Sequence, residues 1–360
     1  MIYNFIPESI ILDVDDYNSE IKIHSFENIL FRTEVCENFY NFHTPIAVKD
    51  KKIISISNKQ LSFLIHKYKH FIGDNYGLKI KNTYDNLIQN NSYIEIEEPV
   101  FLFFDYESVS GTGHAYDLMF YLLYYYITNK LNQKLLVVNS NNEYYNKLLI
   151  LIKKYYKIEY IYIDINKNYI IKEFKCIRTY QNVFFKEIKE FINNTLIKPI
   201  MEYHKNSFYY SIISKIKIVD KNSINPLSIS FPITEQYEIF CKKNNIYDLN
   251  IINDEEYKIY LLNKAEKIII NWGSIFYVNI NYYISDYANK YISLIFDNSM
   301  LPQINFIKKI NNDYFMQEIP DWATGGYNDQ IYKTSIFKGE IISHVNSLDE
   351  YISRTKLLSI

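Results

Sequence analysis

The sequence predicts an α/β protein built from two units, each with a parallel sheet covered by helices. Between residues 98 and 165, short apolar runs typical of strands alternate with longer segments typical of helices. The same alternation returns between residues 211 and 296, and the stretch between the two regions reads as a helix. Because parallel strands are joined by crossover helices, each alternating region indicates a sheet of its own.

The composition is that of a globular chain with an unusual choice of residues. Hydrophobic residues make up 48% of the 360 positions, enough for two domains with separate cores. The chain has 37 Tyr and 23 Phe but only 8 Gly and 8 Pro, a bias that an A/T-rich genome produces, so we do not read the tyrosines as nucleic-acid stacking platforms. A formal net charge of -2 also argues against a nucleic-acid partner.

Cysteine spacing and hydropathy predict neither a metal site nor a membrane span. Cys36, Cys176 and Cys241 lie far apart and match no metal-binding spacing, so we expect reduced thiols and no metal or cofactor. The first residues show no signal-peptide pattern, and no window offers about 18 uncharged apolar residues. We expect a cytoplasmic protein without a transmembrane segment, and peripheral membrane contact stays open.

Residues 1–185 are expected to form the first α/β domain. Its first 95 or so residues offer only short strand-like pieces (SIILDV, IKIHSF, KIISIS) and a helix near Lys59 to Phe71, so we expect this part to be irregular. After Pro99 the elements are clear. They are the strand VFLFFDY, the helix HAYDLMFYLLYYYITNK, the strand KLLVVNS, the helix NEYYNKLLILIKKYY and the strand IEYIYID.

A linking helix, interrupted near Pro199, is expected over residues 186–210, followed by a Rossmann-like domain over residues 211–312. The second domain should open with a strand from Lys215 to Asp220 and continue with a helix, the strand YDLNIIN and a helix from Asp254 to Lys264. Asn253 or Asp254 supplies the side-chain oxygen that caps this last helix. The tail, residues 313–360, reads as irregular and should pack back on the domains.

The isoleucine run from Lys267 to Asn271 fits a strand buried on both faces. Trp272, Gly273 and Ser274 then lead into the helical sequence SIFYVNINYYI and the strand YISLIF. Backbone N–H groups exposed at such a strand-to-helix turn favour a phosphate or another anion. The plainer alternative is that a sharp turn requires glycine whether or not anything binds.

Other residues could complete such an anion site. Asn279 lies about one and a half turns into the helix after the glycine, facing either a ligand or the sheet. Lys217 and Lys221, with Lys215 beside them, would neutralise a diphosphate if they point into a cleft, and otherwise form a solvated edge.

His114 and Asp117 are the acid–base candidates of the chain. They follow Gly111 and Gly113 at a predicted helix start, and residues three apart on a helix share a face. The carboxylate would then hold the imidazole ready as a general base. Alternatively, His114 packs against the preceding loop and Asp117 complements the helix dipole.

Several common catalytic motifs are missing from the sequence. It contains no Walker lysine loop, no HExxH, no GxSxG and no convincing DxD. The acidic group of Asp13, Asp15 and Asp16 has no phosphate-site context.

The order of these parts resembles glycosyltransferase family 61. The similarity runs from Val100 to Phe296 and rests on GTGHAYDLMFYLLYYY, PITEQYEIF and INDEEYKIYLLNKAEKIIINWGSIFYVNINYYI. Gly273, Ser274 and Asn279 fall near the glycine, small residue and asparagine of the family's later turn, and His114 falls near its histidine. This chain has Trp272 where the family commonly has a histidine, and lysines where the family has an arginine pair.

The resemblance implies a GT-B architecture, in which two Rossmann-like domains face each other across a cleft. It also implies inverting transfer of a sugar from a nucleotide-sugar to a hydroxyl of a glycan or glycoconjugate, without an essential metal. Two other functions fit the same scaffold: a pyruvyl or phosphate-ester transferase of polysaccharide assembly, or a non-catalytic glycan-binding protein.

Overall fold

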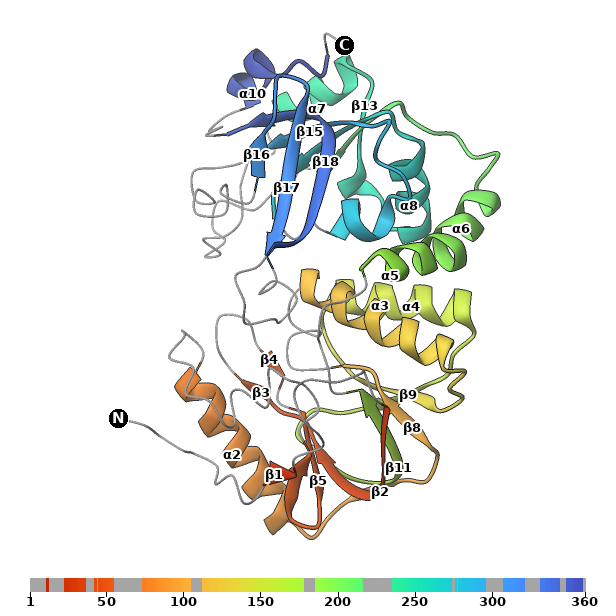
Figure 1. Ribbon diagram of the computed structural model, residues 1–360, viewed down its shortest axis with the longest axis vertical. Helices are drawn as coiled ribbons and strands as arrows, with labels where there is room; N and C mark the ends of the chain where they lie inside the picture. Colours follow the sequence, from red (N-terminus) through yellow and green to blue (C-terminus); the bar gives the residue numbers. More distant parts are fainter. Residues whose placement is uncertain are drawn as a thin grey trace. The chain divides into compact units, whose positions relative to one another are not determined.

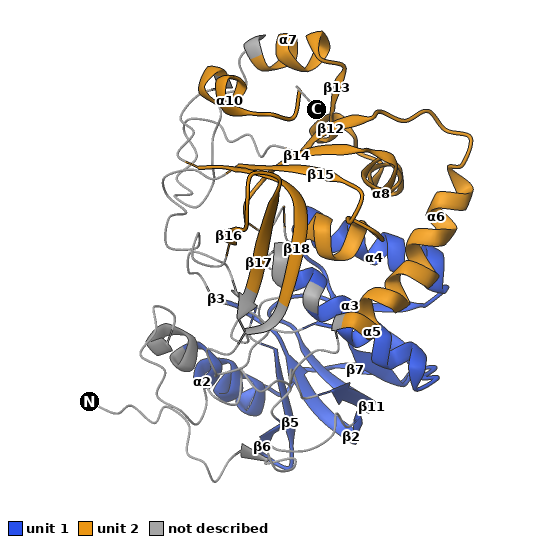
Figure 2. Cartoon of the chain, turned by 45° about the horizontal axis from the view of Figure 1, so that its top comes forward, with its two compact units in different colours: residues 1–183, 324–326 blue, residues 184–323, 327–360 orange. Residues whose placement is uncertain are grey.

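The chain divides into two units, Met1–Val183 with Thr324–Gly326, and Phe184–Ala323 with Tyr327–Ile360 (Figure 2). The predicted domain boundary near residue 185 lies close to this division. In each unit a mixed sheet is packed against helices (Figure 1), so the predicted α/β class is confirmed in the computed structural model. The structure describes residues 11–12, 23–36, 42–43, 45–54, 73–104, 112–177, 185–215, 235–273, 276, 278–295, 307–320, 331–343 and 348–358.

The sheet of the first unit is half parallel and half antiparallel. Its strands follow the order β1-β6-β5-β2-β11-β8-β9-β10, and β7 also pairs with β11. From β11 to β10 the neighbours are parallel, whereas β6, β5, β2 and β11 pair antiparallel. These strands are β1 (Ile11–Leu12), β2 (Ile23–Arg32), β5 (Ile46–Lys49), β6 (Lys52–Ile54), β7 (Ile94–Ile96), β8 (Val100–Leu102), β9 (Lys134–Val138), β10 (Tyr160–Ile163) and β11 (Asn168–Ile177).

The parallel half of this sheet is the part that the sequence predicts. The helices α3 (Thr112–Thr128) and α4 (Glu143–Tyr156) connect β8, β9 and β10 in turn, and they pack against each other. Asn142 caps α4 by accepting hydrogen bonds from the backbone N–H groups of Tyr144 and Tyr145. The left-handed backbone of Lys157 ends the same helix.

The predicted irregularity of the first 95 residues is wrong. This region contributes four strands to the sheet, the small hairpin of β3 (Val35–Cys36) and β4 (Phe42–His43), and the helix α2 (Gly73–Gln89). The strand-like pieces SIILDV, IKIHSF and KIISIS coincide with β1, β2 and β6, whereas β5 and α2 were not predicted. The predicted helix from Lys59 to Phe71 lies outside the described residues.

The second unit contains a sheet whose parallel part has the order β13-β12-β14-β15-β18. In chain order these are the second, first, third, fourth and fifth parallel strands. The antiparallel strands β17 and β16 extend the sheet beyond β18. The strands are β12 (Ile212–Lys215), β13 (Ile246–Asp248), β14 (Lys267–Asn271), β15 (Tyr291–Ile295), β16 (Ile307–Lys309), β17 (Tyr314–Pro320) and β18 (Ile331–Ile342).

Helices cover both faces of the parallel strands. On one face, α7 (Glu235–Lys243) and α10 (Leu348–Arg354) share a buried apolar cluster with β13, β14, β15 and β18. Figure 2 shows α8 (Glu255–Lys264) on the other side of these strands, where it packs against the helix α6 (Lys198–Tyr203) and the π-helical turn η4 (Asn279–Tyr283). The α8 prediction is confirmed down to its cap, because the Asp254 carboxylate accepts from the N–H groups of Glu256 and Tyr257.

The expected linking helix belongs to the second unit, and a π-helical turn interrupts it near Pro199, as predicted. It consists of α5 (Phe185–Ile192), the π-helical turn η2 (Asn193–Ile197) and α6 (Lys198–Tyr203). Pro199 stands in the first turn of α6, where a proline has no N–H to donate backward, which fits a wider turn just before it. The helix ends at Tyr203, earlier than predicted.

The prediction of an irregular tail is also wrong, because residues 313–360 supply β17, β18 and α10. Strand β18 pairs in parallel with β15 and is therefore an interior strand of the sheet. Its sequence mixes isoleucine with Lys, Thr, Ser, Gly and Glu, so it lacks the continuous apolar run that identifies β14. No described helix is long and apolar enough to cross a bilayer.

Candidate ligand-binding site

The parallel sheet of the second unit changes direction between β12 and β14. From β12 the chain moves outward to β13, then returns past β12 to β14 and continues to β15. In open α/β sheets of this order, ligands bind outside the carboxyl ends of the strands at this switch point. The residues that end β12, β13 and β14 therefore define the candidate site.

Three polar side chains meet where β12 and β13 end. The Lys215 ammonium donates to Asn250 Oδ1 over 3.0 Å. The Asp248 carboxylate accepts from the Asn250 backbone N–H at 2.9 Å and from its side-chain amide at 2.8 Å. Burial raises the pKa of Asp248, and the hydrogen bonds from Asn250 and the charge of Lys215 oppose this rise. Asn250 thus connects a cation on the first strand to an acid on the second.

A buried layer supports these residues from the α7 side. The hydroxyls of Ser214 and Tyr237 lie 2.5 Å apart, and Ser214 has no exposed surface. Burial raises the pKa of Tyr237 far above its usual value, so the phenol stays neutral. Burial also raises the pKa of Cys241 to about 11, which makes this free thiol a poor nucleophile. This layer is structural rather than reactive.

The glycine turn follows the carboxyl end of β14, next to the carboxyl end of β12. Gly273 has φ of 111°, a conformation that side chains disfavour, so the turn needs glycine. The Trp272 backbone N–H donates to Ile295 O at 2.9 Å, and its indole packs against the Phe276 ring with centroids 5.4 Å apart. Ser274 lies outside the described residues. Trp272 thus fixes the turn against β15 and the following helical residues.

The sequence predicts that Asn279 lies in a regular α-helix, but it does not. Phe276 and Val278 are α-helical, but Asn279–Tyr283 form the π-helical turn η4. Asn279 is 8% exposed and therefore is part of the packed interior. π-Helical turns occur frequently at functional sites.

The remaining predicted site residues are only partly described. Lys217 and Lys221 lie outside the described residues, and β12 covers Ile212–Lys215 rather than Lys215 to Asp220. His114 and Asp117 lie in the first two turns of α3, as predicted, but their side chains are outside the described part. Lys215 and Gly273 therefore lie where the neighbouring parallel strands β12 and β14 end. The pairing of His114 with Asp117 stays a prediction.

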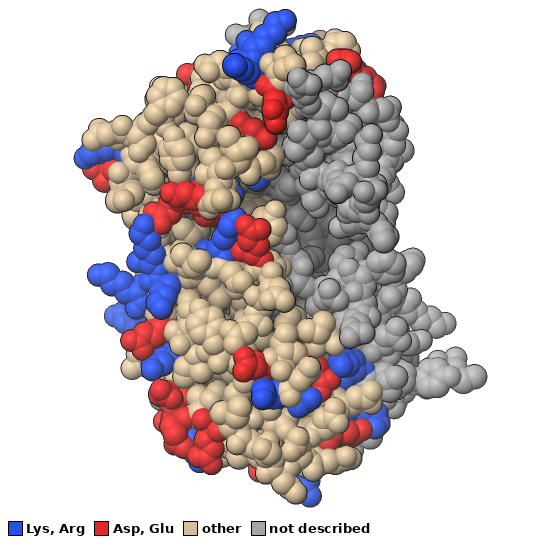
Figure 3. Space-filling view, turned by 180° about the vertical axis from the view of Figure 1, so that it is seen from behind, with Lys and Arg blue, Asp and Glu red and all other residues tan. Residues whose placement is uncertain are grey.

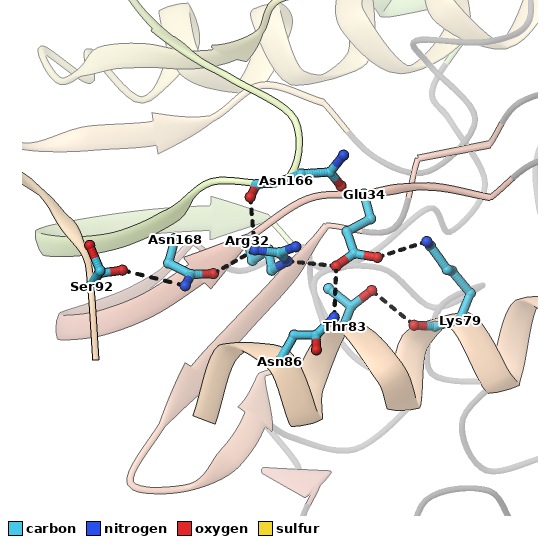
Figure 4. A network of polar contacts seen from close by, with 8 residues as sticks. All are labelled: Arg32, Glu34, Lys79, Thr83, Asn86, Ser92, Asn166 and Asn168. Carbon is cyan, nitrogen blue, oxygen red and sulfur yellow. Dashed lines mark hydrogen bonds and ion pairs between the residues drawn. The ribbon is translucent and has the colours of Figure 1, made fainter. Parts of the chain in front are cut away.

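The first unit contains a separate polar network around Glu34 (Figure 4). Its carboxylate accepts from Arg32 Nε at 2.6 Å, pairs with the Lys79 ammonium at 2.7 Å and accepts from Asn86 at 3.3 Å. Burial alone would raise the pKa of Glu34, but the hydrogen bonds from Lys79 and Arg32 outweigh it and the pKa is lowered. Arg32 also donates to Asn168 Oδ1 at 2.8 Å. This network fastens α2 to β2 and β11, so we interpret it as structural.

Charged side chains, including potential metal ligands, are distributed over the described surface. On the face shown in Figure 3, acidic and basic side chains are interspersed over most of the described surface, and several basic side chains gather at the left edge of the view. Across the described ranges, no three His, Cys, Asp or Glu side chains form a group able to hold a metal ion.

Comparison with known proteins does not narrow the function further. No protein-family model and no curated protein matches the sequence. The site residues that sequence reasoning missed are Asp248 and Asn250. The predicted strand YDLNIIN begins at Tyr247, whereas β13 ends at Asp248, so no local signal marked these two residues as following the end of a strand.

Proposed function

We propose that the protein is an inverting glycosyltransferase that binds a nucleotide-sugar in its second unit. The observation that carries the proposal is the position of the Gly273 turn, which follows the third parallel strand beside the switch point of the sheet. Lys215 supplies a positive charge at the end of the neighbouring strand β12. A glycine turn and a cation at one crevice suit a diphosphate.

The proposed architecture is of the GT-B type, with the first unit binding the acceptor. In the proposed reaction, His114 takes the proton from an acceptor hydroxyl while Asp117 orients the imidazole. The acceptor oxygen forms a bond to the anomeric carbon from the face opposite the leaving group, which inverts that carbon. The bond from the anomeric carbon to the phosphate oxygen breaks, and its electrons go to the nucleoside diphosphate, where the N–H groups of the glycine turn stabilise the new charge.

Replacing the proposed base tests the catalytic half of this assignment. His114→Ala should reduce sugar transfer by at least about 100-fold, because general-base catalysis typically contributes that much or more. Donor binding and thermal stability should stay near those of the unmodified protein. Full transfer activity in His114→Ala would show that His114 is not the base.

A donor panel separates the proposed function from its alternatives. Nucleotide-sugars should bind and transfer equally in the presence of EDTA, since the resemblance implies metal-independent chemistry. Binding of phosphoenolpyruvate with no nucleotide-sugar binding would favour a pyruvyl transferase. Binding of a glycan without any nucleotide would favour a non-catalytic glycan-binding protein.

A further inference from the structure

We infer that Asp248 binds the ribose hydroxyls of the donor nucleotide and so selects ribonucleoside diphosphate sugars over their 2′-deoxy counterparts. The inference rests on the proposed function and adds to it the class of nucleotide and the residue that recognises it.

The position of Asp248 in the sheet is the first reason. It ends β13, the second parallel strand, which pairs directly with the first strand β12. In nucleotide-binding sheets of the Rossmann type, an acid at the end of the second strand accepts hydrogen bonds from the ribose, while the phosphates lie beside the first strand. The order β13-β12-β14 preserves this neighbourhood of first and second strand.

The hydrogen bonds of the carboxylate are the second reason. Both bonds from Asn250 end on Oδ1 of Asp248. Within the described part of the chain, no hydrogen bond to Oδ2 occurs, so one oxygen of a half-buried carboxylate remains to accept. Two adjacent hydroxyls donate well to a carboxylate, because an ionised acceptor makes shorter and stronger hydrogen bonds than a neutral one.

The arrangement of the three strand ends gives the ligand a direction. Asp248 ends β13, Lys215 ends β12, and Gly273 follows β14. Two strand spacings separate β13 from β14, roughly 10 Å. That span is comparable to the distance between the ribose hydroxyls and the outer phosphate of an extended nucleoside diphosphate. The ribose would thus lie over β13, with the phosphates passing Lys215 toward the glycine turn.

The test compares ribonucleotides with their 2′-deoxy forms by isothermal titration calorimetry. UDP, GDP, ADP and CDP are each measured beside the matching 2′-deoxynucleoside diphosphate. For the nucleotides that bind, we expect the ribose form to bind at least about 10-fold more tightly, as expected for loss of a hydrogen bond to a charged group. In Asp248→Asn this ratio should fall to within about twofold, because the amide nitrogen that replaces Oδ2 cannot accept.

Asp248→Asn keeps an oxygen that can still accept from the Asn250 N–H, so the local turn should survive. The matched control is Asp286→Asn, because Asp286 also accepts from a backbone N–H, that of Ala288 at 2.8 Å, but lies before β15 at the opposite edge of the sheet. This control should keep the ribose preference.

The outcomes separate the inference from the function on which it rests. Equal binding of ribose and deoxyribose forms by the unmodified protein would overturn the inference and leave the proposed function standing. A ribose preference that persists in Asp248→Asn would likewise overturn it. Failure of the unmodified protein to bind any nucleotide or nucleotide-sugar would instead overturn the proposed function. The comparison within the unmodified protein holds even if a variant does not fold.

Discussion

His43 is a buried imidazole on the short strand β4, with 5% of its surface exposed. Its Nδ1 atom is buried and has no hydrogen-bond partner in the described part of the chain. Burial lowers the pKa of His43 to about 4 from an ordinary value of 6.5. The folded protein therefore holds this ring neutral at pH values where the imidazole of the unfolded chain, which titrates around pH 6.5, is already largely protonated.

Acidification should consequently destabilise the protein through His43. Because the folded pKa is the lower one, the unfolded state binds more protons between pH 6.5 and 4, and stability falls as the pH falls through that window. From pH 8 to pH 5 the loss attributable to this residue is about 2 kcal/mol of unfolding free energy. Urea denaturation at both pH values measures it. His43→Asn should show a smaller acid loss, and an unchanged loss would contradict the assignment.

Gly273 could be recognised as a candidate site residue from the sequence alone, whereas Asp248 could not. Gly273 stands out because it follows an isoleucine strand and precedes helical sequence, and its left-handed backbone fits that interpretation. Asp248 does not stand out, because an acid near a short strand is common. Its meaning comes from the strand order, which depends on pairing between segments far apart in the chain.

One buried carboxylate, that of Glu340, fastens the C-terminal segment to the sheet of the second unit. Glu340 on β18 accepts from the Ser293 hydroxyl at 2.8 Å, from the Thr355 hydroxyl at 2.5 Å and from the Lys356 backbone N–H at 2.9 Å. The Tyr351 hydroxyl donates to Ser293 at 3.1 Å. The segment after α10 therefore completes the core instead of lying loosely over it.

Removing this carboxylate should weaken the second unit. Glu340→Ala leaves one buried donor and two part-buried donors without their acceptor, so we expect a loss of about 2–4 kcal/mol in unfolding free energy. The C-terminal segment should also become cleavable in limited proteolysis followed by mass spectrometry. Glu202→Ala, which removes only an exposed ion pair with Lys205, should change stability by less than about 1 kcal/mol. Equal effects of the two substitutions would refute the anchoring role of Glu340.

Gly339 is the position where β15 and β18 tolerate no side chain. It has φ of 149°, and a Cβ atom there would stand 2.0 Å from the Ile292 carbonyl oxygen of the neighbouring strand. Gly339→Ala should therefore separate the two strands and lower the yield of folded protein or its midpoint of thermal unfolding. The neighbouring exposed residue offers a control, since Lys338→Ala meets no such contact. Near-normal stability of Gly339→Ala would show that Gly339 does not lie against the Ile292 backbone.

Elements with strong local signals could be predicted from the sequence, and elements defined by distant pairing could not. Strand β14 is found because Lys267–Asn271 is a continuous apolar run, and α8 because Asp254 caps an acidic first turn. The ten-residue strand β11 was missed because lysines and a glutamate interrupt its apolar residues, and its partners β2 and β8 lie far away in the chain.

For the molecule as a whole, the strand order of the second unit supports the functional proposal most directly. Two α/β units were predicted from the alternation of strands and helices, and both are present. The antiparallel half of the first sheet and the closure of the second by residues 313–360 were not predicted, because β2, β17 and β18 carry mixed sequences. Of the three strands whose ends define the candidate site, only β14 was predicted with its correct bounds, because β12 and β13 end earlier than the predicted strands.

Thermal unfolding of the unmodified protein with a panel of nucleotide-sugars tests the proposed glycosyltransferase function most directly. A ligand that binds only the folded state at 100 times its Kd stabilises it by about 2.7 kcal/mol, which should raise the Tm by about 5 °C or more. We predict that at least one nucleotide-sugar produces this shift, with or without divalent metal. If no nucleotide-sugar raises the Tm while phosphoenolpyruvate or a free glycan does, the assignment as a glycosyltransferase is wrong.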